Sequence, residues 1–157
     1  MKSCNYNDYS KGLDAMRINT QFPVAVHILS ALAYFSDDPL PSEIVAKSIG
    51  TNPVVVRRIM SRLRKKGLVD TKPGVKGGVL TRDPGKITLL DVYNAVRTEN
   101  DTLFDIHPGA HPDCPVGAHF FEAINKPLLS AQRTMEKELA SYTLLDVLKF
   151  IKRSNAR

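Results

Sequence analysis

The sequence has few cysteines and no long apolar run, and both absences narrow the class of protein. Its 157 residues contain no apolar run of the roughly 18 residues that a membrane-spanning helix needs. No signal peptide is recognisable at the start of the chain. The two cysteines, Cys4 and Cys114, are far apart and predict no disulfide framework. We therefore expect a cytoplasmic protein with one domain, or one domain with an appendage.

Acidic residues are scarce in one part of the chain, and this part gives the protein its positive charge. The net charge is +6, yet residues 42–86 hold 11 Lys and Arg against 3 Asp and Glu. The remaining residues hold 11 basic and 13 acidic side chains, so the basic surplus lies wholly within 42–86. A polyanion is the expected partner of such a segment, and nucleic acid is the polyanion we favour.

Residues 50–67 have the pattern of a short basic helix with both ends marked. Asn52 is a good N-cap, Pro53 suits the first helical position, and Gly67 can take the left-handed conformation that ends a helix. The basic residues lie mostly on one face. This pattern alone is also that of a solvated surface helix, and three consecutive valines would allow a strand. The apolar residues recur at helical spacing on one stripe: Val56, Ile59, Met60 and Leu63.

The segments on either side decide between these alternatives. Residues 41–50 predict a second short helix that ends in a tight turn, and the two helices together form a helix-turn-helix pattern. Residues 68–72 and 79–82 predict two short strands around a glycine-rich tip, 73–78. The predicted fold is therefore a winged helix, mainly α-helical with a small β-hairpin wing.

The sequence divides into four predicted regions. Residues 1–15 are polar and are expected to form a flexible N-terminal extension. Residues 16–97 form the winged helix-turn-helix DNA-binding domain, which opens with a largely apolar helix over 18–35. Residues 98–115 form a sensor-type loop rich in Pro, Asp, Asn and His. Residues 116–157 form the dimerisation helices.

The string Thr-Leu-Leu-Asp-Val occurs twice, at 88–92 and at 143–147. Each copy has a threonine and, three positions later, an aspartate, as in a variant of the capping box. Both copies therefore predict the start of a helix. We interpret the recurrence as reuse of a good start signal and not as a domain repeat.

Residues 116–142 have the pattern of one long helix with an apolar stripe. Pro127 should kink or break this helix near Lys126. The stripe needs a second surface, and in a chain of this size we expect the same helix of a second copy, which gives a twofold dimer. The alternative is packing against its own domain. The residues assigned to dimerisation are Phe120, Ile124, Leu128, Ala131, Met135 and Leu139.

The chain shares a pattern with known regulators over five stretches. They are residues 16–20, 25–26, 61–69, the glycine-containing 74–78, and 87–96. Together they resemble the Rrf2 family of bacterial winged-helix transcription regulators. The resemblance runs from Met16 nearly to the C-terminus and favours Met16 as the family-like start. It implies a homodimeric regulator of transcription, here expected to be a repressor, with a long dimerisation helix. Two reading helices about one DNA turn apart, roughly 34–36 Å, would read a palindrome.

The loop before the long helix departs from the pattern of the cluster-binding members of that family. Those members hold an iron–sulfur cluster with three cysteines in this loop, whereas only Cys114 matches here. The positions six and eight residues earlier hold Pro108 and Ile106. We therefore expect no iron–sulfur cluster and no other cofactor, and the effector stays unknown.

Three residues of the same loop keep other hypotheses open. His107, His111 and Cys114 are spaced so that they could converge on zinc, although no fourth ligand is obvious. Alternatively, Cys114 is a redox sensor, since the N-terminus of a helix stabilises a thiolate. The third interpretation is a surface loop with ordinary histidines. Cys114 with His111 does not suggest an enzyme, because no orienting third group or oxyanion donor is evident.

The predicted DNA contacts lie on the basic helix and the wing. We assign Val54 and Val55 to thymine methyl groups, and Arg57 or Arg58 to guanine O6 and N7. In the resembled family, the positions matching Val54, Arg57 and Arg58 face the bases. A winged helix that binds protein or RNA is the alternative function. Asn52, at the start of the helix, is also assigned to DNA binding. The residues assigned to phosphates are Ser42, Ser61, Arg62, Lys65 and Lys76.

Overall fold

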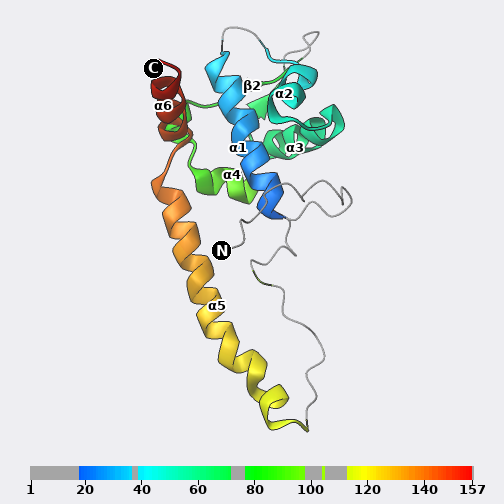
Figure 1. Ribbon diagram of the computed structural model, residues 1–157, viewed down its shortest axis with the longest axis vertical. Helices are drawn as coiled ribbons and strands as arrows, with labels where there is room; N and C mark the ends of the chain where they lie inside the picture. The colour runs from blue at the N-terminus through cyan, green and yellow to red at the C-terminus, as the bar shows by residue number, and fades with distance from the viewer. Residues whose placement is uncertain (1–17, 37–38, 72–76, 98–103, 105–112, 157) are drawn as a thin grey trace, which may run out of the picture.

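The computed structural model describes residues 18–36, 39–71, 77–97, 104 and 113–156. These residues form a mainly helical molecule with one small antiparallel sheet (Figure 1). The elements in chain order are α1 (Ile18–Tyr34), α2 (Ser42–Ile49), α3 (Pro53–Lys65), β1 (Val69–Asp70), β2 (Val79–Leu80), the short 3-10 helix η1 (Pro84–Lys86), α4 (Leu89–Val96), α5 (Pro115–Ser141) and α6 (Leu144–Asn155). The extension 1–15 lies outside the described residues.

The hydrophobic core lies where α1 crosses the other helices of the winged domain. Ala25, Ile28 and Leu29 of α1 are fully buried, and they pack with apolar residues of α2, α3, α4 and α6. The helix predicted over 18–35 is confirmed, and it continues through Pro23 without interruption. Because α6 also packs on this core, the last helix of the chain belongs to the same body as the first (Figure 1).

The helix-turn-helix forms with the ends that the sequence predicted. Gly50 ends α2 with φ 74°, in the left-handed region. The side chain of Asn52 accepts a hydrogen bond from the backbone N–H of Val54 at 2.8 Å, and Pro53 opens α3. Gly67 follows α3 with φ 66°. Local capping chemistry therefore sets the length of the basic helix.

The wing is a two-stranded antiparallel hairpin in which Val69 pairs with Leu80 and Asp70 with Val79. The strands are shorter than predicted. Gly78 lies close against α3 and β1, since an added Cβ would lie 2.4 Å from Cε of Met60 and 3.0 Å from Cγ1 of Val69. This close approach seats the hairpin directly on α3.

The two Thr-Leu-Leu-Asp-Val copies both start helices, as predicted, and each forms a complete capping box. The two copies also lie side by side, and their threonines form an antiparallel bridge. The N–H of Leu89 donates to the carbonyl of Tyr142 at 2.9 Å, and the N–H of Leu144 donates to the carbonyl of Ile87 at 2.9 Å. This reciprocal pair of hydrogen bonds ties α6 to the start of α4. The sequence showed the recurrence, but not the pairing.

The long helix α5 extends away from the compact part of the molecule (Figure 1). It runs from Pro115 to Ser141 as one helix that includes Pro127, so the predicted break near Lys126 does not occur. No residue of α5 is buried. Among the described residues, none of the helices combines the length and apolar character needed to span a membrane.

The capping box of α6 predicts a pH-dependent contribution to stability. The Asp146 carboxylate accepts hydrogen bonds from the Thr143 hydroxyl at 2.7 Å and the Thr143 N–H at 2.9 Å, and these bonds lower the pKa of Asp146. A pKa lower in the folded state stabilises the fold above the unfolded pKa. This stability is lost as pH falls through the folded pKa, below about pH 4.

We expect Asp146→Asn to be less stable than the wild type near neutral pH. It should also lose less stability than the wild type between about pH 6 and about pH 2. Denaturant unfolding at a series of pH values measures both quantities. Parallel stability curves for the two proteins would contradict the assignment.

Candidate nucleic-acid interface

The α3 helix presents opposite faces to the core and to solvent. Its buried residues are Val56, Ile59 and Leu63, each with 0% exposed surface. Met60, predicted on the same stripe, is partly buried against the core. With this stripe fixed in the core, the remaining side chains turn outward. The exposed residues are Val54, Arg57, Arg58, Ser61, Arg64 and Lys65.

A hollow of about 530 Å³ lies between the N-terminus of α2, the outer face of α3 and the wing. Arg57, Ser61 and Arg64 line it from α3, where they recur at i, i+4 and i+7. Nη1 of Arg64 donates to the Thr71 hydroxyl at 3.3 Å, which connects α3 to the wing. The α3 wall of the hollow therefore carries two arginines and a serine beside Met60.

Arg57 has an acidic partner inside this hollow. Its Nη1 lies 3.0 Å from Oε1 of Glu43, and 3.5 Å from the Ser42 hydroxyl, to which it also donates. The Arg57 and Glu43 side chains are 55% and 62% exposed, so the ion pair contributes only about 0–1 kcal/mol. A guanidinium held this weakly can be redirected toward a base. Among the described residues, Arg58 makes no comparable side-chain bond, and its side chain is exposed.

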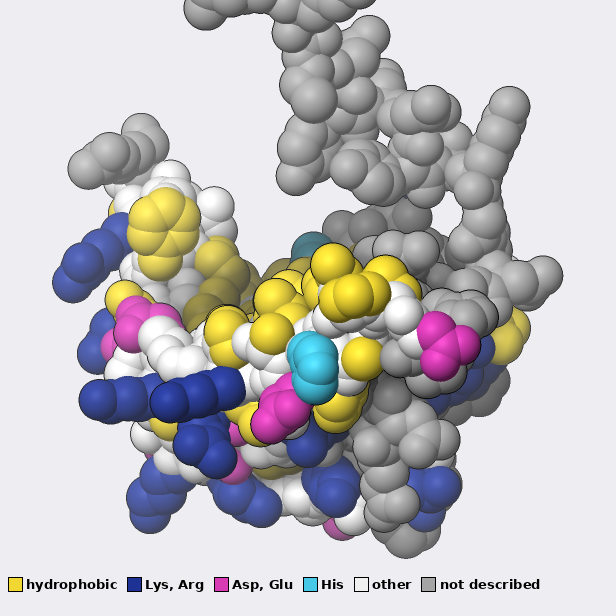
Figure 2. All heavy atoms as spheres, turned by 90° about the horizontal axis from the view of Figure 1, so that it is seen from below, with side chains coloured by type: hydrophobic (Ala, Val, Ile, Leu, Met, Phe, Trp, Pro, Cys, Tyr) yellow, Lys and Arg dark blue, Asp and Glu magenta, His cyan; other side chains and the backbone are white. Residues whose placement is uncertain are grey.

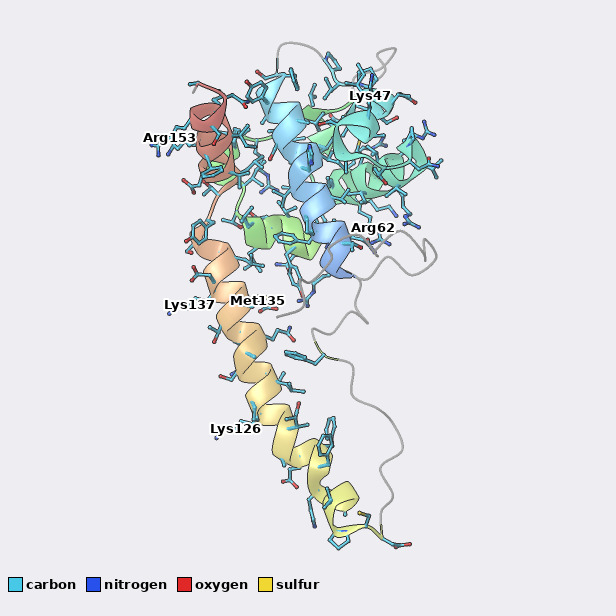
Figure 3. The ribbon with its side chains drawn as sticks, in the orientation of Figure 1. Lys47, Arg62, Lys126, Met135, Lys137 and Arg153 are labelled. Carbon is cyan, nitrogen blue, oxygen red and sulfur yellow. The ribbon has the colours of Figure 1, made fainter. Side chains whose placement is uncertain are left out.

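Arg62 lies differently from the other basic residues of α3, and the phosphate contact assigned to it is revised. Its Nη1 donates to the backbone carbonyl of Val96 at 2.9 Å and to the side-chain oxygen of Gln21. The side chain is half-buried and points toward the N-terminal part of α1 (Figure 3). The guanidinium thus joins α3 to α1 and to the end of α4, where the negative end of the α4 dipole favours a cation.

The other residues predicted to contact DNA differ in how exposed their side chains are. Val54 is 61% exposed and Val55 is half-buried, while Ser61 and Lys65 are exposed on α3. Asn52 uses its side chain to cap α3. Lys76 of the wing tip lies outside the described residues. Glu43, Arg64 and Thr71 were not predicted, although the i, i+4, i+7 spacing from Arg57 would have identified Arg64.

The structure describes one of the three candidate sensor residues. Cys114 is exposed at the N-cap of α5, and the nearby backbone N–H groups of Gly117 and Val116 lower the pKa of its thiol. The direction agrees with the expected effect of a helix N-terminus. His107 and His111 lie outside the described residues, so the predicted zinc arrangement stays a hypothesis.

We predict that Arg62 stabilises the fold, whereas Arg58 does not. Arg62→Met should lower the free energy of unfolding by about 1–3 kcal/mol, because the Val96 carbonyl and Gln21 lose a charged donor. Arg58→Met, one turn earlier on α3, should stay within about 0.5 kcal/mol of the wild type. Urea denaturation compares the three proteins. Equal stability of the two variants would restore a surface role for Arg62.

Comparisons with known proteins identify the family of this chain and its fold. The Rrf2 family model, described as iron-dependent transcriptional regulators, matches residues 18–149. YwnA of Bacillus subtilis (strain 168), provisionally named an HTH-type transcriptional regulator, is 45% identical over 131 residues, which cover 83% of this chain and 96% of YwnA.

Solved structures with the same fold include two that are more than a quarter identical to this chain. A crystal structure provisionally described as a DNA-binding protein has a TM-score of 0.68 and 42% identity, and the match covers 82% of this chain and 98% of that one. A Lactobacillus plantarum protein, provisionally described as a transcriptional regulator, has a TM-score of 0.70 and 26% identity over 84% of this chain and 89% of its own. The predicted winged-helix fold is thereby confirmed, and the chain belongs to the Rrf2 family of DNA-binding transcriptional regulators.

Proposed function

We propose that this Rrf2 regulator is a cytoplasmic homodimer that represses transcription by binding a palindromic operator, without an iron–sulfur cluster. The observation that carries the proposal is the outer face of α3. It presents basic side chains beside an open hollow, while its opposite face is anchored in the core. An α-helix of this kind fits the major groove of B-DNA, and a wing beside it can contact the backbone.

The assignment of base and phosphate contacts follows from position on α3. Val54 and Arg58 are exposed in the N-terminal half of the helix, where side chains reach base edges in helix-turn-helix proteins. Arg57 joins them when it exchanges Glu43 for a base. Lys65, near the C-terminal end of α3, is assigned to a phosphate. Ser42 and Ser61 flank Arg57 and line the same hollow, which suits phosphate contacts.

The α5 helix supports the homodimer. No residue of the helix is buried, and apolar side chains beside the predicted stripe, Val116, Phe121 and Leu129, are 71%, 55% and 45% exposed. Of the stripe itself, Phe120 and Ala131 are exposed, and the half-buried residues are Ile124, Leu128, Met135 and Leu139. Seen from the N-terminal end of α5, apolar side chains lie together at the surface in the middle of the molecule (Figure 2). Lys126 and Lys137 point to one side of α5, and Met135 lies on the other (Figure 3). A second copy of α5 is the partner best matched to this apolar side.

The residues present do not fit the iron site that the family description implies. A cluster held by three cysteines needs three thiolates, and the whole chain has two cysteines, Cys4 and Cys114. Within the part of the chain that the structure describes, no three His, Cys, Asp or Glu side chains gather in a way that could hold a metal ion. We therefore assign no step of the function to iron.

The first test compares two residues of α3 on DNA. A genome-fragment selection with footprinting should yield a near-palindrome with half-sites about one helical turn apart. On that site, Arg58→Ala should weaken specific binding by about 1–3 kcal/mol and leave binding to random duplex nearly unchanged. Lys65→Ala should weaken both alike and reduce the log–log salt slope by about 0.9 per protomer.

Arg153→Ala is the matched control, since this basic residue lies on α6, away from α3 (Figure 3). It should leave operator affinity unchanged. Equal losses for Arg58→Ala on operator and random duplex would overturn the assignment of Arg58 to a base. A preference for RNA, or retention of every fragment alike, would favour the alternative function of a winged helix that does not read DNA sequence.

The second test addresses the dimer. Leu128→Glu places a charge in the apolar stripe, so sedimentation equilibrium should show monomers at concentrations where the wild type is a dimer. Lys126→Glu changes the charge on the opposite side of α5 and should remain dimeric. Circular dichroism should show folded protein for both variants. A dimeric Leu128→Glu variant, or a monomeric wild type, would contradict the role assigned to α5.

A further inference from the structure

The long helix α5 meets the winged domain mainly through α4. No residue of α5 is buried. Among the described residues, those that form the core or pack against it come from other elements and not from α5. Core packing therefore does not fix the direction in which α5 leaves the domain. The polar contacts between α5 and α4 are the features that can fix it.

One of these contacts holds the C-terminal end of α5. The carbonyl of Tyr142, directly after α5, accepts from the N–H of Leu89 at 2.9 Å. Beside it, Thr88 and Thr143 form the antiparallel bridge. A helix that is attached at one end can still swing about that end, so a second point of attachment is needed to set its direction.

The ion pair between Arg97 and Glu136 supplies this second point. Nη1 of Arg97, directly after α4, donates to Oε1 of Glu136 on α5 at 3.1 Å. Nε2 of Gln132, one turn earlier on α5, donates to the same oxygen at 3.0 Å. The Arg97 guanidinium lies over the ring of Tyr93, which is buried and packs edge-on against Phe22. The cation is thus anchored on the domain, and the carboxylate is held by its own helix.

The length of α5 makes its direction important for a dimer. From Leu128, in the middle of the apolar stripe, to Tyr142 the chain rises about 21 Å at about 1.5 Å per residue. A swing of about 10° at Tyr142 would move Leu128 by about 4 Å, close to the roughly 3.4 Å between successive base pairs. In a dimer joined through α5, a swing of this size would shift the second α3 by about one base pair.

We propose that the Arg97–Glu136 ion pair sets the direction of α5 and thereby the spacing of half-sites that the dimer accepts. The inference rests on the proposed binding of a palindromic operator by a dimer joined through α5. Arg97 and Glu136 are not among the residues assigned to DNA or to the apolar stripe. They are positioning residues, which act through the geometry of the dimer.

The test uses the footprinted operator and duplexes in which its half-sites are one or two base pairs closer or farther apart. The wild type should bind the natural spacing about 10-fold or more tightly than the altered ones. Glu136→Gln and Arg97→Met should each reduce this preference by about 3- to 10-fold, since every dimer contains two of the partly exposed pairs. The double variant should lose no more than either single variant, because both substitutions remove the same interaction.

Three controls separate positioning from loss of structure. A duplex with a single half-site should bind the variants as well as the wild type, because α3 is unchanged. Sedimentation equilibrium should show that the variants remain dimers. Glu138→Gln makes the same chemical change at an exposed position two residues further along α5, and it should keep the wild-type preference.

The outcomes distinguish this inference from the function on which it rests. An unchanged spacing preference in Glu136→Gln and Arg97→Met, or an equal loss in Glu138→Gln, overturns the role of the ion pair and leaves the operator-binding dimer in place. Monomeric variants, or weaker binding to the single half-site, would also overturn it. A wild type that binds no palindrome overturns the proposed function and this inference together.

Discussion

The burial of one stripe of α3 is the interaction on which the rest of the structure depends. Val56, Ile59 and Leu63 are fully buried, so the helix cannot rotate about its axis without exposing them to water. Their fixed position determines which side chains face outward, among them Arg57 and Arg58. The same helix also supports the wing through the close contact of Met60 with Gly78. Core packing and the presentation of charge are thus two consequences of one amphipathic helix.

The short helix α4 connects this basic helix to the long one. The carbonyl of Val96, at the end of α4, accepts from Arg62 of α3. The next residue, Arg97, lies 3.1 Å from the carboxylate of Glu136 on α5, and its guanidinium also lies over the Tyr93 ring at 5.8 Å. Val96, the last residue of α4, and Arg97, which follows it, therefore contact α3 and α5 respectively.

Local features could be predicted from the sequence, whereas long-range side-chain partners could not. The caps at Asn52 and Thr143 depend on residues within three positions, so short motifs sufficed to place the helix ends. Arg62 looked like its basic neighbours, because its partners are 41 and 34 residues away. Arg57 was paired by Glu43, 14 residues earlier, through the packing of α2 on α3. Of the kink or break predicted near Lys126, the break does not occur, because a proline removes one helical hydrogen bond without ending every helix.

The described residues expose two surfaces of different chemistry, one basic and one apolar. The face of α3 carries cations with only weak internal partners, which suits a polyanion such as DNA. The α5 helix exposes apolar side chains, among them Phe120, Phe121 and Leu129, that water solvates poorly, which suits another apolar helix. Since the carbonyl of Val96 holds α3 and the Arg97 side chain holds α5, a second copy joined through α5 would bring its own α3 at a set distance. In the proposed dimer, operator spacing would therefore depend on the packing between the two α5 helices and on the contacts of α4 with α5, residues that do not touch DNA.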